Sequence, residues 1–120
     1  GPKFAAKAKG LDTQLPFGAV IGETGDRCAD AARHYVLDHL DGVQGTFDEM
    51  WEANRVWLMK HIENGNPIYD IGYDVDRIGR GPFYAKELAL LDELGYTNIV
   101  PLPWQGSGGT PRSVWSLDDL

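Results

Sequence analysis

Apolar residues recur with helical spacing in three stretches of the chain, and the best delimited stretch runs from Pro82 to Leu94. Pro82 suits the first position of a helix, because proline lacks the N–H that has no intrahelical partner there. Gly95 suits the residue just after the helix, where φ becomes positive. At about 100° per residue the apolar side chains form one broad stripe, which consists of Phe83, Tyr84, Leu88, Leu90, Leu91 and Leu94.

One charged residue interrupts this stripe. Glu87 lies near its middle, whereas Lys86, Asp92 and Glu93 lie on the opposite side of the helix. A carboxylate that points into a core is costly unless another group pairs with it. The pattern therefore predicts that Glu87 faces inward, and it makes Glu87 the first candidate for chemistry.

A second helix is predicted from the capping box Thr46-Phe-Asp-Glu49, in which threonine caps the helix and glutamate follows three residues later. It is expected to run to about Asn64, with Gly65 as the stop signal. Two polar residues, Asn54 and His61, lie inside the apolar stripe of this helix. Both are therefore expected to face inward.

The third predicted helix comes earlier in the chain, from about Asp26 to Leu40. Asp26 is expected to be its N-cap, since a short polar side chain can accept a hydrogen bond from the first free N–H groups. His39 falls on the apolar side of this helix and is also expected to face inward.

Short apolar segments between turn residues predict strands at residues 18–22, 68–73 and 97–102, and a closing edge strand at 113–117. Alternation in the second segment places Tyr69, Ile71 and Tyr73 on one face and Ile68 and Asp70 on the other. We expect an α+β fold, a small single domain in which a short, mostly antiparallel sheet is packed by three helices. Residues 1–12 are expected to be a flexible lead-in or tag remnant, and residues 13–120 to form the domain.

Composition narrows the function classes. The chain has 120 residues and a net charge of −7, which argues mildly against a protein that coats nucleic acid. No apolar run approaches the length that spans a bilayer, and no secretory signal pattern is present. The lone Cys28 allows no internal disulfide and no zinc pattern, and its helix context indicates a buried structural thiol. Phosphate-binding glycine loops and serine-hydrolase motifs are missing from the sequence, and no metal site is predicted.

The inward polar residues predict a single cleft. Glu87, His61 and His39 are the catalytic candidates, because buried carboxylates and imidazoles take pKa values suited to proton transfer. Arginines before a helix N-terminus favour an anion such as phosphate or pyrophosphate. The substrate-binding candidates are Asn54, Asp70, Arg77, Arg80 and Tyr84.

Each candidate also has a structural interpretation. An inward histidine is commonly a hydrogen-bonded core residue, and Asp70 commonly holds a turn through the local backbone. Arg77 or Arg80 can neutralise Glu87 in a buried ion pair without chemistry. A non-enzymatic binding module with a buried polar network therefore remains an alternative.

Two segments together resemble a known family. They are Trp51-Glu-Ala-Asn54-Arg-Val-Trp57-Leu58 followed by His61-Ile62-Glu-Asn-Gly65, and Phe83-Tyr84-Ala-Lys-Glu87-Leu-Ala-Leu-Leu91 followed by Gly95-Tyr96. The chain is similar there to the C-terminal toxin domains of bacterial polymorphic toxins, the variable tips of Rhs-type and contact-dependent growth inhibition proteins. The resemblance covers roughly residues 46–96 and singles out Asn54 and Glu87. The strand Tyr69-Asp-Ile-Gly-Tyr73 departs from the commoner pattern.

The resemblance implies an effector domain, released from a larger delivery protein into the cytoplasm of a target cell and neutralised by a cognate immunity protein. It implies an enzyme, and the first hypothesis is a ribonuclease. In that hypothesis Glu87 and a histidine act as general acid and base, while Arg77 or Arg80 stabilises the phosphorane. The alternative is an NAD-consuming or ADP-ribosyl-transferring toxin, in which Glu87 stabilises the ribose cation and Arg80 holds the pyrophosphate. The acidic net charge suits this alternative better.

Overall fold

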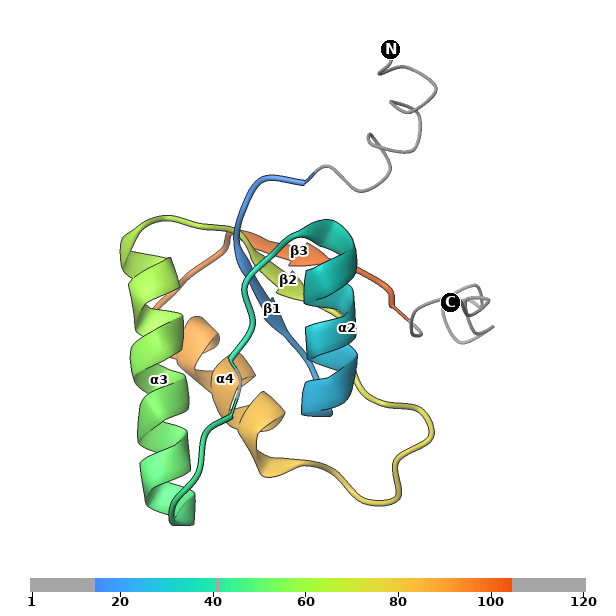
Figure 1. The fold of residues 1–120 in the computed structure, drawn as a ribbon. Helices are drawn as coiled ribbons and strands as arrows, with labels where there is room; N and C mark the ends of the chain where they lie inside the picture. Colours follow the sequence, from blue (N-terminus) through green and yellow to red (C-terminus); the bar gives the residue numbers. More distant parts are fainter. Residues whose placement is uncertain (1–14, 41, 105–120) are drawn as a thin grey trace.

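The structure, a computed structural model, describes residues 15–40 and 42–104. The elements follow one another as β1 (Ala19–Ile21), α2 (Gly25–Tyr35), α3 (Phe47–Glu63), β2 (Ile68–Asp70), α4 (Pro82–Glu93) and β3 (Ile99–Pro101) (Figure 1). They form one small domain with three helices and a three-stranded sheet. The predicted lead-in at residues 1–12 and the predicted edge strand at 113–117 lie outside the described residues.

All three strands are parallel, in the order β1-β2-β3, so the prediction of a mostly antiparallel sheet is wrong. Ala19 is opposite Ile68, and Ile68 is opposite Ile99. Helices separate every pair of consecutive strands, and a chain that crosses over a sheet through a helix returns in the same direction. The fold is therefore a layered α/β arrangement rather than α+β.

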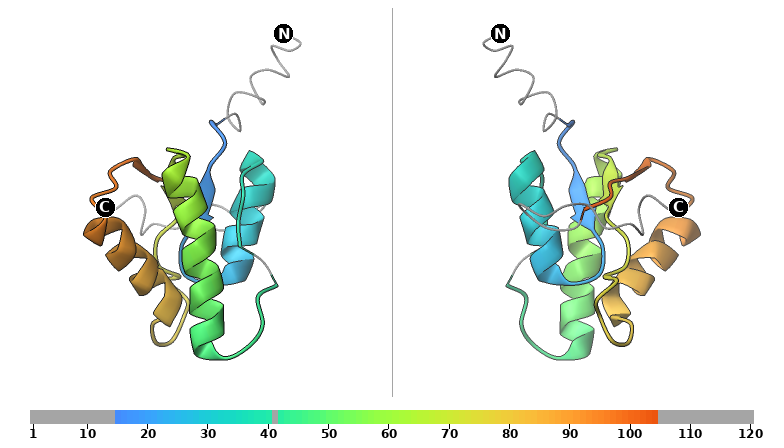
Figure 2. Two further views of the ribbon diagram at one scale, coloured as in Figure 1. Left: turned by 90° about the vertical axis from the view of Figure 1, so that its left-hand side faces the viewer. Right: turned by 90° about the vertical axis from the view of Figure 1, so that its right-hand side faces the viewer.

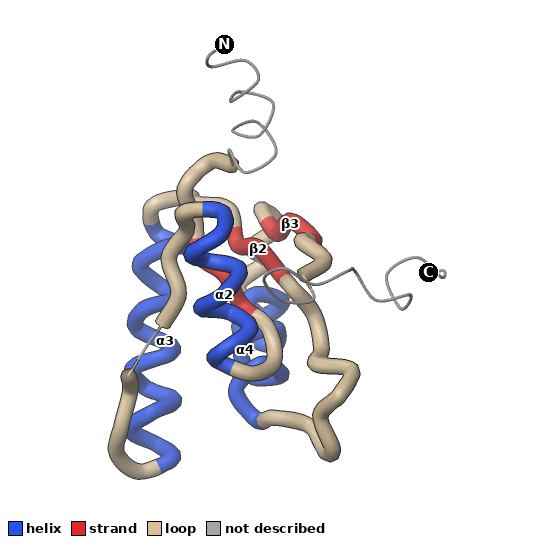
Figure 3. The backbone as a smooth tube through the Cα atoms, turned by 45° about the vertical axis from the view of Figure 1, so that its right-hand side comes forward, coloured by secondary structure: helices blue, strands red, loops and turns tan. Residues whose placement is uncertain are grey.

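Helices cover both faces of the sheet. Alternate strand residues point to opposite sides, so Val20 and Tyr69 pack with α2, while Ala19, Ile21 and Ile68 pack with α3 and α4. Figures 2 and 3 show α2 on one side of the strands and α3 with α4 on the other. The predicted alternation along the second strand is confirmed for Ile68 and Tyr69, which lie on opposite faces.

Local sequence signals predicted the positions of two helices correctly. Thr46 and Glu49 form the predicted capping box at the start of α3, where the Thr46 side chain accepts from the Glu49 N–H and the Glu49 carboxylate accepts from the Thr46 N–H. Pro82 occupies the first turn of α4, and Gly95 follows its end with a φ of 67°.

The helix predicted to reach Leu40 ends at Tyr35 instead. Val36 turns into the left-handed region with a φ of 59°, and the N–H of Leu37 then bonds to the carbonyl of Ala32. The chain next pairs with β1, since the Asp38 N–H donates to the carbonyl of Gly18. Two predictions fail here: His39 is not on a helix, and the N-cap is Thr24 rather than Asp26, which lies in the first turn.

Candidate functional site

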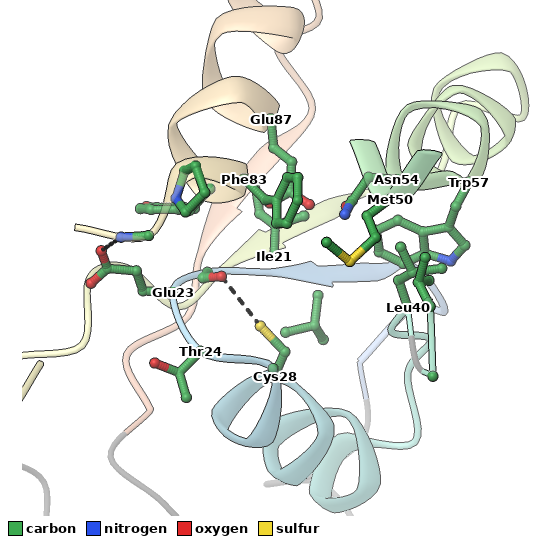
Figure 4. Close-up of a pocket in the computed structure, with 18 of the residues that line it drawn as sticks. Ile21, Glu23, Thr24, Cys28, Leu40, Met50, Asn54, Trp57, Phe83 and Glu87 are labelled. Atoms are coloured by element: carbon green, nitrogen blue, oxygen red, sulfur yellow. Dashed lines mark hydrogen bonds between the residues drawn. The ribbon is translucent and has the colours of Figure 1, made fainter. Parts of the chain in front are cut away.

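A cavity of about 370 Å³ opens beyond the C-terminal end of β1 (Figure 4). Its walls come from the β1–α2 loop, the start of α2, the middle of α3 and the first turns of α4. Ligands of parallel α/β sheets bind at this edge, because the loops after the strands converge there. The topology therefore places the cavity where such folds bind small molecules.

Glu87 extends from α4 into this cavity (Figure 4). Its side chain is buried, at 6% exposure, and no residue that the structure describes donates a hydrogen bond to its carboxyl group. Burial raises the pKa of Glu87 to about 8, and the nearby negative charge of Asp70 adds to this shift. Glu87 is thus a largely protonated acid at neutral pH in the free protein. The predicted inward orientation is confirmed.

Asp70 and Tyr84 form a hydrogen-bonded pair near Glu87. The Tyr84 hydroxyl donates to the Asp70 carboxylate at 2.6 Å, and the Gly72 N–H donates to the same oxygen at 2.9 Å. Burial and this bond raise the pKa of Tyr84, so the phenol keeps its proton. Tyr84 lines the cavity, whereas Asp70 acts on it through the phenol and through its charge on Glu87.

The wall opposite α4 belongs to α3. Met50, Asn54 and Trp57 lie at successive helical turns and all line the cavity. In Figure 4 the Asn54 amide and the Glu87 carboxyl enter the same space from the two helices. The site thus combines the Asn54 amide and the carboxyl groups of Glu87 and Glu23 with apolar side chains, to which Phe83 and Leu40 also contribute.

The two predicted arginines differ in their positions. Arg77 lines the cavity, and its guanidinium lies against Gly81 closely enough that a Cβ there would approach Nη1 to 3.0 Å. Arg80 does not line it; this side chain forms an ion pair with Glu23 at 3.2 Å and lies over the Tyr73 ring at 5.0 Å. Neither arginine pairs with Glu87, so the buried ion pair that was one structural interpretation of Glu87 does not form.

Neither candidate histidine lines the cavity. His61 is buried, but its Nε2 lies 2.8 Å from the Asp38 carboxylate and its Nδ1 lies 3.0 Å from the Asn66 amide. Trp57 Nε1 donates to the same Asp38 oxygen at 2.8 Å. Although burial alone raises the pKa of Asp38, the bonds from His61 and Trp57 leave it below the usual value. His61 therefore joins α3 to the segment beside β1, and the half-buried His39 has only a 3.4 Å contact from Nδ1 to the Leu40 carbonyl.

Cys28 also lines the cavity, with its thiol 3.6 Å from the Gly22 carbonyl. Burial raises the pKa of this thiol to about 12, so the group carries its proton at any physiological pH. A thiol in that state is a poor nucleophile. This matches the expectation of a buried structural cysteine.

Two residues that hold the site together were missed from sequence. Glu23 is the most buried charged side chain among the described residues, at 1% exposure. Arg27 donates to the carbonyls of Glu23, Gly72, Ile71 and Trp104, and so ties the β1–α2 loop to the segments after β2 and β3. A glutamate after a short apolar strand, followed by an arginine one helical turn later, was the available signal for this pair.

Comparisons of the chain with protein-family models, with curated proteins and with solved structures found no match. Within the described residues, no three His, Cys, Asp or Glu side chains are grouped so as to hold a metal ion. None of the described helices has the length and apolar character needed to cross a bilayer.

Proposed function

We propose that this domain is an enzyme that consumes NAD or a closely related nucleotide, and that it acts as a toxin delivered into bacterial cells. One observation carries the enzymatic part: Glu87 is buried in a cavity of ligand size with no hydrogen-bond donor among the described residues. Leaving a carboxyl group in that state is costly for a structural residue. A ligand that offers it a positive charge or a hydroxyl offsets the cost.

The charges around Glu87 favour a cationic group beside it. The carboxylate of Asp70, together with that of Glu87 once Glu87 has lost its proton, favours a positively charged nicotinamide ring and the cation that forms on the ribose when its glycosidic bond breaks. A phosphate at this position would be repelled. Arg77 also lines the cavity, beside Gly81, and suits a pyrophosphate.

The residues that line the cavity can be given roles in cleavage of the glycosidic bond to nicotinamide. When the C1′–N bond to nicotinamide breaks, the electron pair leaves with the ring nitrogen, so the leaving group needs no proton. Approach of the cationic ring lowers the pKa of Glu87 and converts it to a carboxylate that stabilises the positive ribose. Water then adds to C1′ and gives up a proton, which Glu87 accepts. Asn54 is placed to orient a ribose hydroxyl, and Trp57 and Phe83 supply the apolar wall for the ring.

The ribonuclease hypothesis fits the geometry less well. It needs a histidine beside Glu87 to share proton transfer on the 2′-hydroxyl and the leaving oxygen. His61 is engaged with Asp38 and Asn66, and neither His61 nor His39 lines the cavity. For that reason the NAD-consuming alternative is the proposal.

The toxin part of the proposal is supported by the resemblance of residues 46–96 to polymorphic toxin tips. It includes delivery by a larger protein and neutralisation by a cognate immunity protein. Expression of the chain in bacterial cytoplasm tests it, with Glu87→Gln as the inactive variant. Growth arrest by the wild type and normal growth with Glu87→Gln are expected, and equal growth of the two cultures would reject it.

The enzymatic part is tested with purified protein and NAD. Chromatography measures loss of NAD and release of nicotinamide for the wild type, for Glu87→Gln and for Glu93→Gln, an exposed control on the same helix. We expect release with the wild type and the control and a loss of at least about 100-fold with Glu87→Gln, given the size of typical electrostatic contributions. Intact NAD together with degraded total RNA would instead favour the ribonuclease.

A further inference from the structure

We propose that Glu23 is a positioning residue for Glu87, a role that rests on the proposed function only through Glu87 itself. Glu23 follows β1 directly and is buried at 1% exposure. Its two carboxylate oxygens are used separately. Oε1 accepts the Asp74 N–H at 2.8 Å, and Oε2 accepts the Gly81 N–H at 2.9 Å.

The two hydrogen bonds to Glu23 fix the position at which α4 begins. Gly81 is the N-cap of that helix, so the bond from its N–H to Glu23 anchors the helix start to the end of β1. Glu87 lies on the same helix six residues later, and a rigid helix transmits a shift or rotation of its first turn to that position. The depth at which the Glu87 carboxyl enters the cavity is therefore set by a residue on a different element.

Further contacts join the β1–α2 loop to the loop between β2 and α4. Thr24 donates from its hydroxyl to the Asp74 carboxylate at 2.8 Å, and Arg80 forms the 3.2 Å ion pair with Glu23. Although burial alone raises the pKa of Glu23, the N–H groups of Gly81 and Asp74 and the charge of Arg80 hold it below its ordinary range. Glu23 also lines the cavity, but both of its carboxylate oxygens are engaged by backbone N–H groups, and one of them also by Arg80. Glu23 is thus a satisfied anion, in contrast to Glu87, and its role is to hold backbone.

Glu23→Gln tests this assignment, because glutamine has one acceptor oxygen for two N–H groups. Hydrogen exchange and a carboxyl-carbon NMR titration of Glu87 are measured on the unliganded protein, with Glu63→Gln on exposed α3 surface as the matched control. We expect amide exchange at Asp74 and Gly81 to accelerate about tenfold or more, the effect of losing one hydrogen bond. We also expect the titration of Glu87 to move to lower pH as water reaches it.

A second pair of variants covers the case in which Glu23→Gln does not fold. Gly81→Pro removes the N–H at a position whose φ of −75° already suits proline, while Gly81→Ala keeps the N–H and adds only a Cβ against the flexible Arg77. Gly81→Pro is expected to shift the Glu87 titration and Gly81→Ala to leave it in place. An unchanged Glu87 titration in Gly81→Pro would overturn the positioning role.

The two proposals fail in different ways. If the titration shifts in these variants but NAD stays intact with the wild type, Glu23 keeps its positioning role and the NAD-consuming function is rejected. If the wild type consumes NAD and the titration does not move, the function stands and the positioning role is rejected.

Discussion

The free energy of unfolding should depend on pH through Glu87. Its pKa is about 8 in the folded protein, against an ordinary value of 4.5 in the unfolded chain. Between these two values the folded state holds a proton that the unfolded state releases. The contribution of Glu87 to the free energy of unfolding is therefore fully present below pH 4.5 and is lost as the pH rises through 8.

The magnitude follows from the size of the shift. At about 1.4 kcal/mol per pKa unit, the full loss over this window is about 5 kcal/mol, and about 3 kcal/mol of it has occurred by pH 7. Glutamine at this position has nearly the same shape and does not titrate. Glu87→Gln should therefore be more stable than the wild type by about 3 kcal/mol at pH 7, with the difference vanishing near pH 4.5.

Urea unfolding followed by tryptophan fluorescence measures this difference near pH 5, 7 and 9, with Glu93→Gln as the exposed control. The expected result is a gap between wild type and Glu87→Gln that widens with pH, and no such gap for the control. A gap that stays constant to within about 0.5 kcal/mol would refute the reasoning. It would mean that Glu87 is hydrated or paired in the folded state.

Three further predictions concern its neighbours and the helices. Asp70→Asn should lower the pKa of Glu87 while leaving it above the ordinary value, because burial is the larger cause; the same NMR titration measures this shift. His61→Ala should cost about 1–3 kcal/mol in urea unfolding, since it leaves the partly buried Asp38 without one of its donors. Under the proposed function the folded variant should retain the NAD consumption of the wild type, and loss of that activity at full folding would contradict this. Thr46→Ala should cost about 1 kcal/mol through loss of the cap, whereas Thr46→Ser should cost little by the same measurement.

Much of the helical framework was predictable because its signals are local. A capping box, a proline in a first turn and a glycine after a last turn each act within a few residues, and α3 and α4 begin and end close to the predicted positions. The end of α2 carried no such signal. Val36 is a β-branched residue in a left-handed conformation, which the sequence disfavours and which pairing of Asp38 with β1 compensates.

Strand direction and the site walls depended on contacts distant in sequence. Strands of three residues are too short for periodicity to indicate their partners, and the helix between each pair was the signal for parallel pairing that the α+β prediction overlooked. Helical angles brought Asn54, Tyr84 and Glu87 to one cavity. They could not reveal Glu23, because its burial comes from a loop that follows it by about fifty residues.

The two deeply buried glutamates show why burial alone does not identify a catalytic group. Glu23 accepts two backbone N–H groups and an arginine, and its pKa is lowered; Glu87 has no donor among the described residues, and its pKa is raised to about 8. The two residues therefore have different roles. Glu23, as a hydrogen-bonded anion, fixes the backbone, whereas Glu87, which lacks donors, keeps its proton until a ligand binds. If so, ligand binding at neutral pH must release the proton of Glu87. Calorimetric titration of an NAD analogue with an uncleavable glycosidic bond into the wild type, in buffers of different ionisation enthalpy, should detect that release, and Glu87→Gln should abolish it. A buffer-independent enthalpy for the wild type would show that the ligand meets Glu87 as a neutral acid.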